Sequence, residues 1–142
     1  MNDIYNLQRF EKAQDSVYEE VLVELKRGHK SQHWIWYIFP QIKGLGQSEM
    51  AQKFAITSLE EAEAYLEHPV LSLRLRECTQ LVINVEGLTA EQIFGYTDTL
   101  KFRASMTLFM HATKDNKIFK DAIFKYFEDK LDQLTLSILK NS

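Results

Sequence analysis

The sequence has little of what marks extracellular or membrane-spanning proteins. Cys78 is its only cysteine, so no disulfide can form within the chain, and this favours a reducing compartment. The unbroken apolar runs are only a few residues long, too short for a helix that crosses a membrane. The first residues have neither the basic nor the apolar region of a signal peptide. We therefore expect a cytoplasmic protein that has no membrane partner.

The chain also has no large excess of charge of one sign, and it has few of the residues that interrupt helices. The net charge of −3 and the pI near 5.8 argue against a nucleic-acid partner, because nucleic-acid binders usually carry a basic surface. Two prolines and five glycines leave few places where the chain could turn between strands. The apolar fraction of 45% and the charged fraction of 26% are ordinary for a globular protein. A length of 142 residues fits one domain, which we expect to span residues 1–142.

Apolar residues recur at three- and four-residue steps almost throughout the chain, which predicts helices. The longest expected helix runs from about Asn6 to Arg27, and Gly28 fits its end because glycine tolerates a positive φ. The other expected helices are shorter. The sequence thus predicts an all-α fold, a single compact domain of about seven to nine helices, several of them short.

Polar residues stand where these helices should begin. Hydroxyl and amide side chains at such positions can accept hydrogen bonds from the free N–H groups of the first turn. A helix through the aromatic residues before Pro40 is expected to begin at a serine. The expected caps are Ser31, Ser48, Ser58, Thr89 and Asn116, with either Thr97 or Asp98 beginning another helix.

The segment from Lys30 to Ser48 holds the densest group of unusual residues. Four aromatic residues, including both tryptophans, fall within six positions: Trp34, Trp36, Tyr37 and Phe39. Such rings suit a wall that is part core and part ligand cleft. Residues at alternate positions cannot all face one way on a helix, so some of these rings should point away from the core. The outward aromatic residues are candidates for ligand binding.

A second group of polar residues falls on one predicted helix. Asp98, Lys101 and Ser105 are separated by three and four positions, which places them on one helix face. A carboxylate, an ammonium and a hydroxyl in a row could bind a polar or phosphorylated ligand. The alternative is that Asp98 caps the helix and pairs with Lys101 on the surface, which is the more common arrangement.

His33 could act as a general acid or base, since the ordinary pKa of histidine lies near neutrality. The alternative is a histidine that hydrogen-bonds to backbone at a helix start. His29 and His33 have the spacing of two metal ligands on a helix. However, Gly28 and Ser31 are expected to break that helix, and no carboxylate or cysteine lies nearby. We expect neither a metal nor a cofactor, and no motif names a reaction, so the sequence leaves open whether the protein is an enzyme.

Several strings in the sequence carry a resemblance to a known family. They include His33-Trp34-x-Trp36-x-x-Phe39-Pro40-Gln41, Gly44-Leu45-Gly46-x-Ser48, Phe94-Gly95-x-x-Asp98 and Ser105-Met106-Thr107-Leu108-Phe109. With further matches, they cover nearly the whole chain and resemble the bacterial domain-of-unknown-function family numbered 1810. The resemblance implies a mainly helical single domain and no established activity. It gives weight to polar positions that have no obvious role in folding: Lys30, His33, Gln41, Ser48, Asp98, Lys101 and Ser105.

Two positions depart from the family pattern. Ala104 stands where the family often has a serine, and Thr99 stands where it often has a second acidic residue. If either residue were catalytic in relatives, this chain would need another group for the same task.

Three functions are compatible with these observations. The first is binding or processing of a small anionic, nucleotide-like ligand, in a pocket between the segment from His33 to Gln41 and the helix from Asp98 to Ser105. The second is an interaction module whose exposed aromatic cluster docks a partner protein. The third is a structural domain with no site. In the first, His33 and Asp98 are the catalytic candidates, and the ligand-binding candidates are Lys30, Trp34, Trp36, Gln41, Ser48, Lys101 and Ser105.

Overall fold

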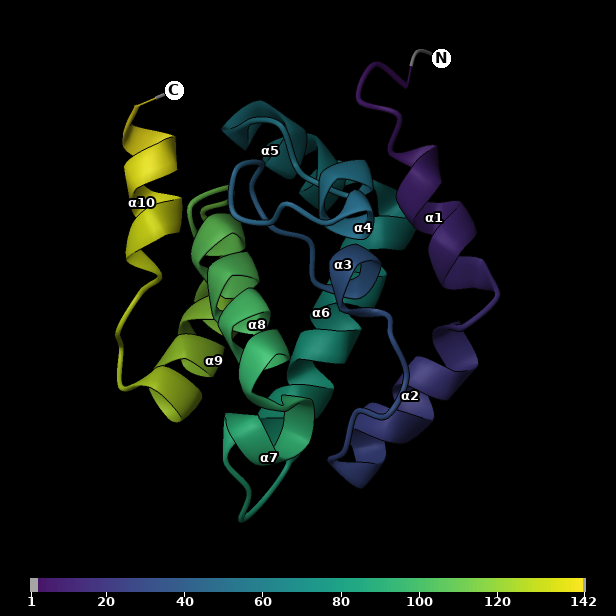
Figure 1. Ribbon diagram of the computed structural model, residues 1–142, viewed down its shortest axis with the longest axis vertical. Helices are drawn as coiled ribbons and strands as arrows, with labels where there is room; N and C mark the ends of the chain where they lie inside the picture. The colour runs from purple at the N-terminus through teal and green to yellow at the C-terminus, as the bar shows by residue number, and fades with distance from the viewer. Residues whose placement is uncertain (1–2, 142) are drawn as a thin grey trace.

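Ten helices make up the fold in the computed structural model, which describes residues 3–141 (Figure 1). About 65% of the chain is helical, and the described residues include no strand, so the prediction of an all-α domain is confirmed. Residues 1, 2 and 142, the ends of the expected domain, lie outside the described part. The helices are α1 (Gln8–Asp15), α2 (Tyr18–Arg27), α3 (Ile35–Ile38), α4 (Glu49–Lys53), α5 (Leu59–Glu67), α6 (Pro69–Asn84), α7 (Ala90–Phe94), α8 (Tyr96–Met110), α9 (Lys117–Phe127) and α10 (Gln133–Lys140).

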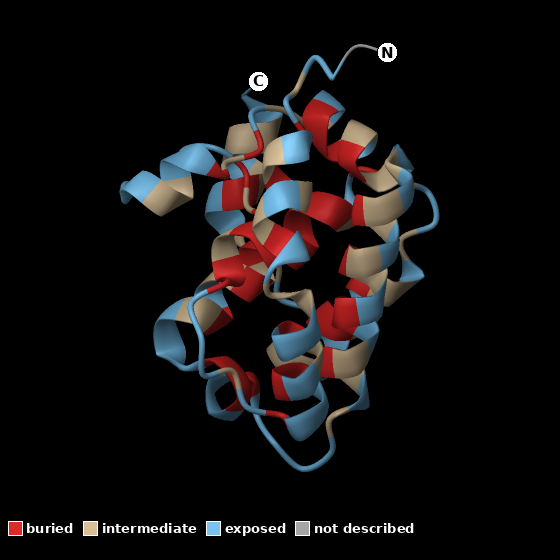
Figure 2. Cartoon of the chain, turned by 90° about the vertical axis from the view of Figure 1, so that its right-hand side faces the viewer, coloured by how far each residue is buried: buried red, intermediate tan, exposed pale blue. Residues whose placement is uncertain are grey.

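Helices α6 and α8, the two longest, form the middle of the molecule (Figure 1). Helix α6 contacts α1, α2, α3, α5 and α9, while α8 contacts α3, α5, α7, α9 and α10. The buried residues lie on the inward sides of the helices and the exposed residues on the outward sides (Figure 2). No helix within residues 3–141 is both long enough and apolar enough to cross a membrane.

The N-terminal helix differs from the prediction, because the chain forms two helices where one was expected. The break falls at Ser16 and Val17, and Val17 adopts φ −125° and ψ −4°, outside the helical region. The bend lets α1 pack on α3 and α6 while α2 packs on α6. Because Phe10 and Leu25 are both fully buried on either side of the bend, the apolar spacing continues through it and hides it from sequence analysis.

Three of the expected helix caps are present. Ser48 accepts a hydrogen bond from the Ala51 N–H, and Ser58 accepts one from the Glu61 N–H. Thr89 forms a full capping box with Gln92. Gly28 ends α2 with φ 78°, as the sequence indicated.

Two of the expected caps are wrong. Helix α3 begins after Trp34, and Ser31 instead donates its backbone N–H to the carboxylate of Glu24. Asn116 precedes α9, but its side-chain amide donates to the Met110 carbonyl and does not cap the helix.

Candidate functional site

The aromatic residues of the segment from Lys30 to Ser48 divide between the core and the surface. Trp34 and Phe39 are buried, with 1% and 0% of their surface exposed. Phe39 packs edge-on against Phe102 of α8, with ring centroids 4.9 Å apart. Trp36 is only partly buried. The segment therefore contacts α8, as expected, and Trp36 is the tryptophan that faces outward.

A buried carboxylate holds the start of this segment in place. One oxygen of Glu24 accepts hydrogen bonds from the backbone N–H groups of Ser31 and Gln32, at 2.7 and 3.1 Å, and from the Trp34 indole N–H at 3.0 Å. Burial alone would raise the pKa of Glu24, but these hydrogen bonds outweigh it, and the pKa lies below its ordinary value. Glu24 thus fixes both the backbone before α3 and the orientation of Trp34.

Lys30, Asp98 and Lys101 form one cluster beside Trp34. The Lys30 Nζ lies 2.6 Å from one oxygen of Asp98, and the Lys101 Nζ lies 3.6 Å from the other. The Lys30 side chain is only 6% exposed, and its ammonium lies 5.1 Å from the centre of a Trp34 ring. Because Asp98 already meets both lysines, an anionic guest would have to compete with it for their charge.

Asp98 does not cap helix α8. That helix begins at Tyr96, one residue before the earlier of the two expected starts, and Gly95 precedes it without a side-chain hydrogen bond. The alternative explanation for Asp98 had two parts. The expected pairing with Lys101 is observed, but the expected helix cap is wrong.

Three other predicted site residues make no hydrogen bond or ion pair with this cluster within residues 3–141. His33 is exposed and makes no hydrogen bond or ion pair with any residue between 3 and 141. Ser48 caps α4. Ser105 is fully buried, and its hydroxyl has no hydrogen-bond partner among the described residues. A catalytic role for His33 or Asp98 stays a prediction, and so does ligand binding by Ser48 or Ser105.

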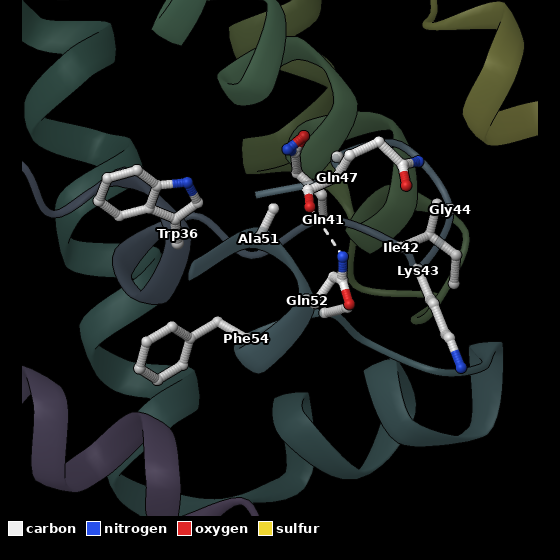
Figure 3. Close-up of a pocket in the computed structure, with 11 residues that line it drawn as sticks. Trp36, Gln41, Ile42, Lys43, Gly44, Gln47, Ala51, Gln52 and Phe54 are labelled. Atoms are coloured by element: carbon white, nitrogen blue, oxygen red, sulfur yellow. Dashed lines mark hydrogen bonds between the residues drawn. The ribbon is translucent and has the colours of Figure 1, made fainter. Parts of the chain in front are cut away.

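A pocket with a volume of about 360 Å³ lies between α3 and α4. Trp36 and Phe54 lie on one side of it, whereas Lys43 and Gly44 lie on the opposite side (Figure 3). Gln52 stands between them and donates to the Gln47 carbonyl at 2.7 Å. We call this space the α3–α4 pocket. Its lining is completed by Gln41, Ile42, Gly46, Gln47, Ala51 and Ala55.

Two backbone hydrogen bonds and one close contact shape the part of the α3–α4 pocket that the loop of residues 41–47 provides. Ile42 and Ile56 form an isolated β-bridge. The backbone N–H of Ile56 donates to the Gln41 carbonyl, and the backbone N–H of Lys43 donates to the Ile56 carbonyl. The loop that follows then lies against α4. A Cβ atom on Gly46 would lie only 2.5 Å from the Cβ of Ala51, so this approach requires glycine.

One residue that lines the pocket carries an unused hydrogen-bond donor. The Trp36 indole nitrogen is buried and has no partner among the described residues. An indole N–H can only donate, and leaving such a group buried and unpaired costs about 1–3 kcal/mol. Almost none of the nitrogen's surface is accessible, so an acceptor on a guest molecule would remove this cost only if the side chains around the indole moved to admit it.

The α3–α4 pocket therefore brings together two of the predicted ligand-binding residues, Trp36 and Gln41, and not Lys30, Trp34 or Lys101. Lys43 and Gln47, which also line the pocket, are exposed polar residues of a loop and follow no periodic pattern that would mark them in the sequence. The two glycines after Pro40 were the available signal. Between residues 3 and 141, no group of three or more acidic, histidine or cysteine side chains could hold a metal ion.

Comparisons with known proteins agree with this fold. The model of a family described as "Protein of unknown function (DUF1810)" matches residues 4–139. The chain is also similar to a solved structure, the conserved hypothetical protein Rv1873 from Mycobacterium tuberculosis, with 47% sequence identity and a TM-score of 0.96. That match covers 97% of this chain and 99% of the other. No curated protein matches the chain.

Proposed function

Because the chain belongs to the family of proteins of unknown function numbered DUF1810, we propose its function from its own site: it binds a small nucleotide-like molecule whose ring enters the α3–α4 pocket. The observation that carries this proposal is the unpaired Trp36 indole N–H, a buried donor that needs an acceptor. A nucleobase offers such acceptors on its ring nitrogens and carbonyl oxygens.

The composition of the α3–α4 pocket supports the same class of ligand. Trp36 and Phe54 supply aromatic surface, against which a flat ring can stack. The side-chain amides of Gln41, Gln47 and Gln52 both donate and accept hydrogen bonds. The volume of about 360 Å³ lies within the usual range for small-molecule pockets.

The proposal concerns binding and assigns no reaction. Lys43 is the only charged residue among those that line the pocket in the described chain. A general acid or base must lie within hydrogen-bond reach of the group whose proton it moves. The ligand itself would have to bring such a group, or a residue from outside the lining would have to approach it.

The alternative function, docking of a partner protein on an exposed aromatic cluster, has less support. Trp34, Tyr37 and Phe39 are all buried. Trp36 is the most exposed of the four aromatic residues, and it lines a concave pocket. Docking surfaces are usually flatter and broader.

Calorimetry and tryptophan fluorescence with adenosine, uridine and their monophosphates test the proposal. Trp36→Phe keeps an aromatic ring but removes the indole N–H, so it should weaken binding about fivefold, the factor for one hydrogen bond of about 1 kcal/mol. Ligand should also quench wild-type fluorescence and leave that of the variant, which then comes from buried Trp34 alone, nearly unchanged. Gln80→Ala is the control, because Gln80 is exposed on α6 and, within residues 3–141, its side chain bonds only to Asn84.

Two results would overturn the proposal. One is that none of the four compounds binds the wild-type protein. The other is that Trp36→Phe binds as tightly as Gln80→Ala, which would show that the indole N–H does not contact the ligand.

A further inference from the structure

A second hollow adjoins the α3–α4 pocket and carries excess positive charge. The two share Lys43, Gln52 and Ala55 in their linings, so they are neighbours along this wall. The charged residues that line the second hollow are Arg9, Lys43, Lys53 and Glu61. We call it the basic hollow.

Arg9 is committed to holding the backbone of this wall. Its guanidinium donates to the carbonyls of Lys53 and Ala55, at 2.9 and 2.8 Å, and pairs with Glu61 at 3.0 Å. Glu61 also accepts from the backbone and hydroxyl of Thr57. Arg9 and Glu61 therefore neutralise each other and have little capacity left for a guest.

Lys43 and Lys53 are different. Both are exposed, and neither forms an ion pair with any residue in the described part of the chain. The Lys53 ammonium lies 5.3 Å from the centre of the Phe54 ring, and Phe54 lines the α3–α4 pocket. The basic hollow thus has two uncompensated positive charges in a chain whose net charge is −3.

We propose that the basic hollow binds the phosphate of a nucleotide whose ring occupies the α3–α4 pocket, with Lys43 and Lys53 as the binding cations. This inference rests on the proposed function, since it places the second part of the same ligand. Lysine binds phosphate as a point charge, and both lysines are free to approach it. Lys30 and Lys101, in contrast, already face Asp98.

The arrangement of the two spaces fits the shape of a nucleotide. Trp36 and Lys43 lie on opposite sides of the α3–α4 pocket (Figure 3). A guest that stacks on the Trp36 side would direct its other end towards Lys43 and the basic hollow. A nucleotide has this polarity, with a flat ring at one end and a negative phosphate at the other.

The experiment compares adenosine, adenosine monophosphate and inorganic pyrophosphate by calorimetry at low and high salt. The proteins are wild type, Lys43→Gln, Lys53→Gln and the control Lys114→Gln. Lys114 is exposed, has no ion pair in the described part of the chain, and lines neither of the two spaces. The monophosphate should bind more tightly than adenosine, and added salt should reduce this advantage by screening. Each of the first two variants should weaken monophosphate binding about fivefold, the factor for a charge contact of about 1 kcal/mol. Lys53→Gln should leave adenosine binding unchanged, because Lys53 does not line the α3–α4 pocket.

The outcomes separate this inference from the proposed function. If adenosine binds but the phosphate adds nothing, or if Lys43→Gln and Lys53→Gln behave like Lys114→Gln, the phosphate site is overturned and the ring pocket stands. If adenosine does not bind wild type while binding of pyrophosphate and of the monophosphate depends on both lysines, the ring pocket fails and the anion site stands. If none of the three compounds binds, both proposals fail.

Discussion

The indole N–H of Trp34 donates to the Glu24 carboxylate at 3.0 Å, whereas the indole N–H of Trp36, two residues later, is buried without a partner. The same Glu24 oxygen also holds two backbone N–H groups of the preceding loop. The two tryptophans of the chain therefore differ in role: Trp34 is fixed within the structure, and Trp36 has a donor to offer.

Replacing Glu24 by glutamine should destabilise the protein in a pH-dependent way. Loss of the charged acceptor should lower the free energy of unfolding by about 1–3 kcal/mol at neutral pH. Because the pKa of folded Glu24 lies below its ordinary value of 4.5, the carboxylate contributes fully above that pH and loses its contribution as the pH falls below it. Urea unfolding of wild type and Glu24→Gln between neutral pH and about pH 3 measures this. The difference between them should shrink on acidification.

Glu63→Gln provides the control for this series, since Glu63 is exposed on α5. It should unfold like wild type at every pH. A stability difference for Glu24→Gln that stayed constant down to acidic pH would contradict the assigned role of the charge.

Asp98→Ala should cost more stability than the loss of a surface ion pair. The Lys30 side chain is only 6% exposed, and the substitution would remove the carboxylate that now lies 2.6 Å from its ammonium. An unpaired buried charge is costly. We expect the free energy of unfolding to fall by about 2–3 kcal/mol. Asp121→Ala, which breaks the exposed pair with Lys117, should have little effect in the same urea titration. Equal effects of the two substitutions would mean that Asp98 contributes no more than a surface residue.

The all-α fold was predictable because helical periodicity is a local property of the sequence. The bend at Val17 was not, because Phe10 and Leu25 keep the same apolar spacing across it. The pairing of Lys30 with Asp98 depends on how distant helices meet, so the sequence indicated two polar residues without obvious partners and suggested a ligand.

The same limit applies to the candidate site. Trp36 was identifiable as a residue that could face outward, since neighbours on a short helix point in different directions. Lys43, in contrast, is an exposed loop residue, and nothing in its local sequence separates it from other surface lysines. Its place beside a pocket follows from the bridge between Ile42 and Ile56, which joins segments on both sides of α4.

Phe10→Ala tests the packing beneath the α3–α4 pocket. Phe10 is fully buried, and its ring centre lies 5.2 Å from that of Tyr65 and 5.7 Å from that of Phe54. Truncation removes buried apolar surface and leaves a cavity, so the free energy of unfolding should fall by about 3–5 kcal/mol. Urea unfolding measures the loss. A value below about 1 kcal/mol, typical of a mild surface substitution, would show that this face of α1 does not anchor the core.

The contact between Gly46 and Ala51 can be tested by a pair of substitutions that should compensate each other. A Cβ on Gly46 would lie 2.5 Å from the Ala51 Cβ, so Gly46→Ala should force the loop away from α4 and cost about 1–3 kcal/mol, as overpacking usually does. Ala51→Gly removes the obstructing atom, after which the new Cβ would meet the Ala51 Cα at 4.0 Å, an ordinary contact. Alone, that substitution should cost about 0.5–1 kcal/mol because glycine weakens a helix.

The double variant should therefore be more stable than the sum of the single effects predicts, by at least about 0.5 kcal/mol. Urea unfolding of all four proteins gives this coupling energy. Additive effects would show that the loop can move away from α4 without cost. The wall of the α3–α4 pocket would then be mobile, because Gly46 and Ala51 both line it.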